Sequence, residues 1–214
     1  MLPNQDNTES LATGVHLVDA KEGLSQIQDP TCAAAIWQRG TLTDIQPLID
    51  ELSPENLPKA NVIIPPEHLP KTVNEICGKA GIPDCLERKM LVEDIVMLAD
   101  VFVKLIPTPF LRLRLDVVTT NACRKFHIDY LKARLVCTYR GTGTQYGNST
   151  DGADPLHIST VPTGAPILLR GKHWPNTPDP CLLHRSPPIE GTGETRLVLV
   201  LDAAEKMYDE EELL

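Results

Sequence analysis

The stretch Leu111-Arg-Leu-Arg-Leu115 alternates apolar and charged residues with a period of two. In an extended strand successive side chains point to opposite faces, so the three leucines share one face and Arg112 and Arg114 share the other. The stretch therefore predicts a half-buried strand whose leucines face a core. It also divides the chain, because helical patterns precede it and strand patterns follow it.

The residues after this strand contain several more candidate strands. Apolar and β-branched runs are separated there by Gly, Pro, Asn and Asp, a pattern typical of short strands joined by turns. The candidate strands are 124–128, 131–139, 157–160, 167–170, 181–184 and 196–201. Six or seven short strands within about 95 residues predict a β-sandwich, jelly roll or barrel.

The residues before the strand are expected to be mainly helical. Apolar residues recur at three- and four-residue spacing over 85–106, which predicts a helix with one face packed on a sheet. Asp84 is the expected N-cap, and Glu87 three residues later would complete a capping box. Shorter helices are expected at 43–52 and 67–79, and short strands at 33–38 and 62–64.

A chain of 214 residues suits one domain, and we expect 1–214 to form a single α+β unit. Residues 1–30 are polar and lack periodicity, so they are expected to form a loosely ordered lead-in. A mainly helical part is expected over 31–109 and the β core over 110–202.

The formal net charge of −9 argues against a nucleic-acid partner, because phosphate binding needs clustered Lys and Arg. No basic leader and no apolar run of about 20 residues is present, so we expect a soluble cytoplasmic protein without a membrane partner. The six cysteines form no C-x-x-C pair, and free thiols are expected rather than disulfides or a zinc knuckle.

Three residues have the chemistry of a metal site. His127 and Asp129 are two residues apart, so on an extended segment their side chains project to the same side and can share one ion. His184 closes an apolar strand and could supply a third ligand. Two histidines and one carboxylate on one face of a metal are typical of non-haem iron(II) oxygenases, although an isolated H-x-D triplet is also typical of a surface hydrogen-bonded pair.

The order of these features resembles the double-stranded β-helix of the iron(II) and 2-oxoglutarate-dependent dioxygenases, over residues 110–202. In that order a strand ends in H-x-D, further strands follow, a histidine closes another strand, and Arg196 opens a last apolar strand. The resemblance implies a jelly-roll, cupin-like fold with the N-terminal helices packed on its sheet. It also implies that His127, Asp129 and His184 hold catalytic Fe(II), and that Arg196 pairs with the distal carboxylate of 2-oxoglutarate.

Tyr139 lies near the end of the strand that follows the H-x-D triplet, where its hydroxyl could donate a hydrogen bond to a bound co-substrate carboxylate. The same position suits a core tyrosine equally well. Arg134 could line the mouth of the cavity, and Asp116 and Asp202 could orient a ligand histidine.

Four segments also resemble an uncharacterised bacterial family of unknown function, some members of which are thought to lie beside zinc-homeostasis genes. The segments are Phe126–Asp129, Leu135–Gly141, Leu168–Trp174 and Leu183–Pro188.

The sequence thus favours an oxygenase that uses Fe(II) and 2-oxoglutarate to hydroxylate an unknown substrate. Two alternatives stay open, a non-catalytic zinc-binding or metal-homeostasis protein on the same fold and a cupin-like enzyme with another reaction. An Arg196 that lines the metal cavity would favour the oxygenase.

Overall fold

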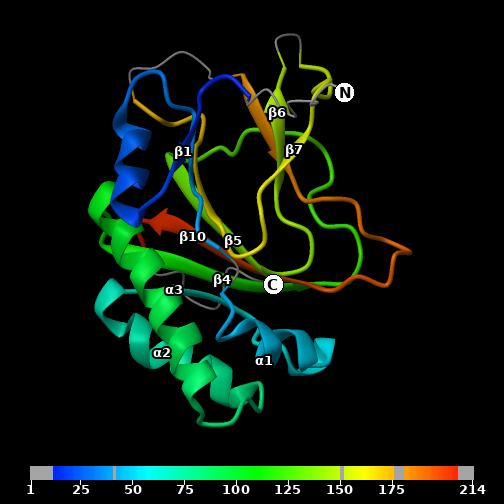
Figure 1. Ribbon diagram of the computed structural model, residues 1–214. Helices are drawn as coiled ribbons and strands as arrows, with labels where there is room; N and C mark the ends of the chain where they lie inside the picture. The colour runs from blue at the N-terminus through cyan, green and yellow to red at the C-terminus, as the bar shows by residue number, and fades with distance from the viewer. Residues whose placement is uncertain (1–11, 41, 150–151, 176–180, 207–214) are drawn as a thin grey trace, which may run out of the picture.

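Figure 1 shows the computed structural model of the chain, which describes residues 12–40, 42–149, 152–175 and 181–206. Two β-sheets make up the centre of these residues. The major sheet contains, in spatial order, β1 (Val15–Val18), β2 (Ala34–Trp37), β8 (Pro166–Arg170), β5 (Ala133–Arg140), β10 (Arg196–Ala204), β4 (Phe110–Val118) and β3 (Ala60–Ile64). The minor sheet contains β7 (Ser159–Thr160), β6 (Gln145–Asn148) and β9 (Leu182–Arg185). All strand pairs are antiparallel except β1 with β2.

The two faces of the major sheet pack against different layers. In β10 the leucines at 197, 199 and 201 belong to one buried cluster, whereas Val198 and Val200 belong to another. The second cluster also contains Tyr146 of β6 and Leu182 of β9, so it fills the space between the two sheets. The strict alternation along β10 therefore separates a helix-covered face from a face that looks onto the minor sheet.

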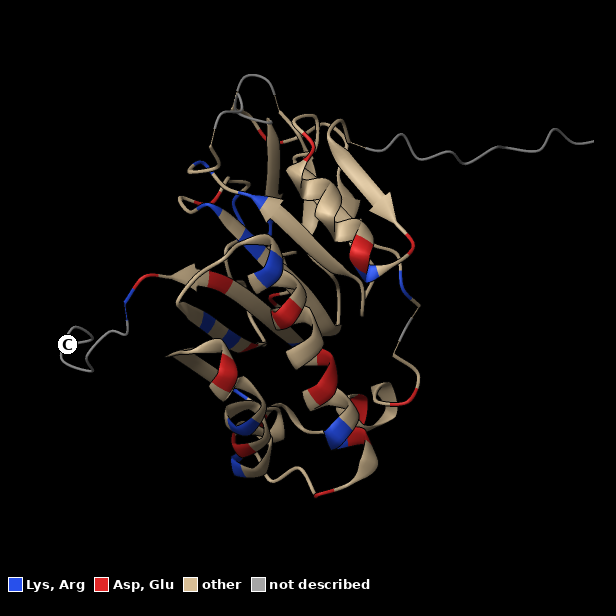
Figure 2. Cartoon of the chain, turned by 90° about the vertical axis from the view of Figure 1, so that its left-hand side faces the viewer, with Lys and Arg blue, Asp and Glu red and all other residues tan. Residues whose placement is uncertain are grey.

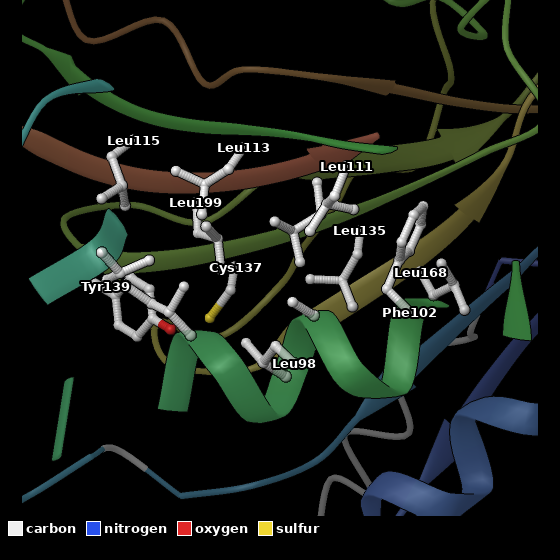
Figure 3. Close-up of a cluster of buried hydrophobic side chains, with 14 of the residues drawn as sticks. Leu98, Phe102, Leu111, Leu113, Leu115, Leu135, Cys137, Tyr139, Leu168 and Leu199 are labelled. Carbon is white, nitrogen blue, oxygen red and sulfur yellow. The ribbon is translucent and has the colours of Figure 1, made fainter. Parts of the chain in front are cut away.

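Helices cover the outer face of the major sheet. The longest, α3 (Leu86–Leu105), buries Leu98 and Phe102 completely against leucines of β4 and β10, as Figure 3 shows. The other helical elements are η1 (Lys21–Gln28), α1 (Gln46–Glu51), η2 (Pro54–Asn56), η3 (Pro66–His68) and α2 (Leu69–Lys79). Acidic and basic side chains are interspersed over this layer in Figure 2, and none of the described helices is long and apolar enough to cross a bilayer.

The architecture is the α+β double-stranded β-helix that the sequence predicts, with the helices packed on the sheet. The predicted strand at 124–128 is wrong, since only His127 pairs there, as an isolated bridge to His184. The predicted cap of α3 is also wrong. Cys85 is the N-cap and makes no side-chain cap hydrogen bond. The Oδ1 atom of Asp84 instead lies 3.7 Å from Nζ of Lys89.

The N-terminal lead-in is more ordered than expected. Residues 1–11 lie outside the described part of the chain, but β1 joins the major sheet and η1 follows it. Leu24 and Ile27 of η1 are fully buried. Two buried residues three apart in an eight-residue element give too short a periodic signal to stand out in the sequence. The part at 31–109, which is expected to be mainly helical, also contributes β2 and β3 to the major sheet.

Candidate metal centre

His127, Asp129 and His184 lie together at one end of the space between the sheets. One ligand atom from each residue lies within 4.8 Å of the other two. Asp129 Oδ1 is 3.5 Å from His127 Nε2, and Asp129 Oδ2 is 3.1 Å from His184 Nε2. Atoms that each bind one ion at about 2.1 Å are separated by roughly 3 Å when they occupy neighbouring positions. The spacing therefore suits three ligands on one side of a single cation.

Backbone pairing brings the two histidines side by side although 57 positions separate their numbers. His127 N donates to His184 O and His184 N donates to His127 O, both at 3.0 Å, and the ring centroids are 4.5 Å apart. His184 is held on its other side by the pairing of β9 with β6. The triad thus combines one strand residue with two residues of the loop between β4 and β5.

The hydrogen bond of His127 leaves the correct nitrogen available for a metal. Its Nδ1 lies 2.8 Å from the carbonyl oxygen of Lys125. Because a carbonyl can only accept, Nδ1 carries the proton and the neutral ring presents its Nε2 lone pair toward Asp129.

Asp129 has one oxygen that is engaged and one that is not. Arg134 donates to Oδ1 at 2.6 Å, whereas Oδ2 is buried and accepts no hydrogen bond despite its closeness to His184. A buried carboxylate oxygen without a hydrogen-bond partner costs free energy. Its presence here is therefore a reason to expect a cation. These donors fit Fe(II) or zinc, because both metals accept imidazole nitrogen and carboxylate oxygen.

The protonation states of Asp129 and His184 suit a metal, whereas His127 holds its proton more firmly. Burial acts to raise the pKa of Asp129, but the two histidines and Arg134 outweigh it and hold that pKa well below its usual range. The Asp129 carboxylate raises the pKa of His127, which is partly exposed. Burial lowers the pKa of His184, so this histidine is neutral at physiological pH.

The triad opens into a cavity of about 260 Å³ between the sheets. Its lining includes His127, His184 and three residues from one face of β10, namely Arg196, Val198 and Val200. Arg196 is 1% exposed, and it donates from Nε to the carbonyl oxygen of Thr142 at 2.6 Å. Among the described residues no carboxylate forms a salt bridge with it, and burial lowers its pKa to about 10. Glu194 acts on Arg196 electrostatically, but the buried charge lines the cavity without a salt bridge among the described residues.

A larger groove of about 510 Å³ lies on the helical side, where Val96, Met97 and Val101 of α3 are among its lining residues. It contains none of the three triad residues. The smaller cavity is the candidate site because it combines potential metal ligands with a buried cation.

Tyr139 does not line this cavity, which corrects the expectation that it binds a co-substrate. Its side chain lies on the helix-covered face of β5, as Figure 3 shows, and its hydroxyl donates to Asp94 Oδ2 at 2.6 Å. Asp94 also forms a salt bridge with Arg39. The reason is the alternation of β5, which points Tyr139 and Arg134 to opposite faces.

Sequence reasoning missed several partners in the cavity. Arg134 forms a bidentate pair with Asp202, at 2.6 and 2.8 Å, besides its bond to Asp129. Asp202 thus orients an arginine rather than a histidine. Arg114 and Arg185 also line the cavity. The alternation around Arg114 could have indicated this, because its strand face is the one opposite the buried leucines.

The comparisons with known proteins agree with this architecture. A family described as a protein of unknown function (DUF1826) matches residues 18–202, from the end of β1 into β10. The chain belongs to the DUF1826 family. This confirms the expected membership of an uncharacterised family, and no curated protein matches the sequence.

Solved structures share the fold of this DUF1826 chain. The dioxygenase for auxin oxidation 1 from Arabidopsis thaliana, in a binary complex with 2-oxoglutarate, superposes with a TM-score of 0.54 at 9% identity over 91% of this chain and 93% of that one. The rice dioxygenase for auxin oxidation gives 0.51 at 12% identity, over 91% and 84% of the two chains. At these identities the similarity establishes the double-stranded β-helix fold.

Proposed function

We propose that this protein is an iron(II) and 2-oxoglutarate-dependent oxygenase. The observation that carries the proposal is the position of Arg196. This buried guanidinium forms no salt bridge with a carboxylate among the described residues, and it lines the same cavity as His127 and His184. A dicarboxylate could bind the metal at one end and Arg196 at the other, and a guanidinium offers a two-pronged fork for a carboxylate.

Bound Fe(II) would supply the activation of dioxygen, in a reaction that turns a substrate C–H bond, O₂ and 2-oxoglutarate into C–OH, succinate and CO₂. The residues of the chain have three separate tasks. His127, Asp129 and His184 hold the metal from one side and leave its other positions accessible. Arg196 orients the co-substrate, with its own orientation set by Thr142. Val198 and Val200 give part of the cavity wall an apolar surface.

The test is a titration of the full chain with Fe(II) and 2-oxoglutarate in the absence of oxygen. The readout is the visible charge-transfer band of the chelate. The parent protein is expected to give the band, and His127→Ala is expected to lose it. Arg196→Gln should lower the affinity for 2-oxoglutarate at least about tenfold, because it removes a charge-assisted pair. Arg112→Gln is the matched control. Arg112 donates from Nε to Oδ1 of Asn61 at 3.0 Å and does not line the cavity.

The zinc-binding alternative predicts a different result. Two histidines, a carboxylate and a water also suit tetrahedral zinc. No charge-transfer band, together with stoichiometric zinc that is lost in His127→Ala, would overturn the oxygenase and leave a zinc-binding protein on the same fold. Arg196 would then have no co-substrate to bind, and Arg196→Gln would leave zinc affinity unchanged.

A further inference from the structure

The cavity is rich in arginine although the chain as a whole is acidic. Its lining contains four arginines: Arg114, Arg134, Arg185 and Arg196. Four carboxylates lie among or behind them, those of Asp116, Asp129, Asp202 and Glu194, the last of which acts on Arg196 electrostatically. The charges of these groups balance, so the hydrogen bonds that each arginine makes decide which of them is open to a ligand. An arginine with unused donors at a cavity wall can bind an anionic group.

One of the four arginines is fully occupied by protein groups, and a second is partly occupied. Arg134 uses three of its nitrogens on Asp202 and Asp129. Arg185 donates from Nε to Gln145 at 2.8 Å, and its guanidinium lies 4.4 Å from the centre of the Phe126 ring. A third, Arg196, is assigned to the co-substrate under the proposed function.

Arg114 differs from the other three because none of its nitrogens makes a hydrogen bond within the described residues. Its Nε is buried without a partner. Its terminal nitrogens approach Asp116 at 3.7 Å and Asp202 at 3.9 Å, which is too far for hydrogen bonds, and no other acceptor binds it within the described residues. The side chain is 26% exposed, so water replaces only part of what is missing. Unsatisfied buried donors are uncommon, and at a cavity wall they indicate a ligand.

We propose that the primary substrate is a small organic acid whose anionic group binds Arg114. This inference rests on the proposed function, because it assigns the substrate to the same metal cavity. Val136, Val198 and Val200 line the cavity beside the arginines and would contact the apolar part of such an acid. The volume of about 260 Å³ lies just below the range for small-molecule sites, roughly 300–1,000 Å³, and 2-oxoglutarate would share it, so the acid must be compact.

The test uses matched acids and amides. The full chain is saturated with Fe(II) and 2-oxoglutarate without oxygen, and butyrate, benzoate or methylphosphonate is added while the charge-transfer band is recorded. Butyramide and benzamide serve as neutral probes of the same size. The acids are expected to shift the band without reducing its intensity, and the amides are expected to have at least tenfold weaker effects. The carboxylates and the phosphonate distinguish the two kinds of anionic group.

Three variants locate the effect. Arg114→Gln is expected to weaken the acid-dependent shift at least tenfold, because the charge is lost. Arg114→Lys keeps the positive charge but lacks the two-pronged donor geometry of a guanidinium. Its acid-dependent shift should lie between those of the parent and Arg114→Gln. Arg112→Gln lies two residues away on the same strand face and should respond as the parent does. The band before acid addition is recorded for every variant, which separates loss of co-substrate from loss of acid binding.

The possible failures have different signatures. A parent that forms the band but responds equally to acids and amides overturns the inference alone. The inference is also overturned if Arg114→Gln responds as the parent does, or if acids only reduce the band by displacing 2-oxoglutarate. A parent that forms no band overturns the proposed function and this inference with it.

Discussion

At the scale of single residues, the candidate site depends on which hydrogen bonds are made and which are not. His127 uses Nδ1 on a backbone carbonyl, and Asp129 uses Oδ1 on Arg134. Each residue is thereby oriented by one polar atom while its other atom points toward the shared position. Metal sites generally need such outer contacts, because they fix the ligand and lower the entropy lost on binding.

Metal binding is expected to depend on pH through His127. The pKa of Asp129 is lowered and that of His184 is lowered, so both are ready to bind metal at neutral pH. The pKa of His127 lies above its usual value of about 6.5, and its proton must leave before a metal binds. Zinc affinity is therefore expected to fall about tenfold per pH unit below that pKa and to level off above it.

Zinc titrations from pH 5.5 to 8 measure this dependence, with His127→Ala as the control in which the slope should disappear. A parent whose affinity is flat across this range would contradict the assignment of His127 as a ligand.

Tyr139→Phe tests the corrected role of that tyrosine. The change removes the hydroxyl that donates to Asp94 in the helix-covered layer. We expect the free energy of unfolding to fall by roughly 1–3 kcal/mol, because a buried carboxylate loses a donor. The affinity for 2-oxoglutarate should stay as in the parent. Thermal unfolding and the charge-transfer titration measure the two quantities, and a selective loss of co-substrate binding would contradict the structural role of Tyr139.

At the scale of elements, the loop between β4 and β5 carries two of the three ligands and is held from behind by the segment after β8. Gly171 N donates to Lys132 O, Lys172 N to Asp129 O, and His173 N to Leu131 O. Gly171 is required for this close approach, because a Cβ at its position would lie 2.0 Å from Leu131 O and 2.8 Å from Asp129 O. Backbone contacts rather than strand pairing therefore position Asp129.

Gly171→Ala should consequently displace the loop and weaken metal binding. The added methyl group meets backbone atoms that cannot rotate away, so Asp129 must move relative to the histidines. We expect at least about tenfold lower zinc affinity, as for other losses of outer contacts. Gly40→Ala is the control, since nothing lies within 4 Å of a Cβ there. Equal zinc affinity of the two variants would show that the loop tolerates the methyl group.

At the scale of the whole molecule, the N-terminal residues complete the major sheet and its cover. Arg170 at the end of β8 donates to the carbonyl oxygens of Ile27 and Asp29, at 2.6 and 2.7 Å. β1 and β2 extend the sheet beyond β8, and η1 packs on its outer face. These contacts join the beginning of the described chain to β8, which pairs with the cavity-lining strand β5.

Ile27→Ala should destabilise the protein although it lies far along the chain from the triad. Ile27 is fully buried, and its truncation leaves a cavity that costs roughly 2–5 kcal/mol of unfolding free energy. Ser25→Ala, an exposed change in the same element, should stay within about 0.5 kcal/mol of the parent. Chemical denaturation measures both variants. Parent-like stability of Ile27→Ala would contradict an integral role for η1.

The sequence by itself determined most of the strands, though not β1 or β6, together with the long helix and the three residues that meet as candidate ligands. Each of these depends on local periodicity, as in Leu111–Leu115, or on a short motif such as His127-x-Asp129, and both are written in neighbouring residues. The tertiary structure alone decided the roles of Tyr139, Arg134 and Arg114. Their roles depend on which strand face meets the minor sheet and on partners such as Asp202, 68 positions from Arg134. Local alternation indicates the strand face of Arg114 and Arg134, but strand pairing between distant segments sets their partners, which no local pattern encodes.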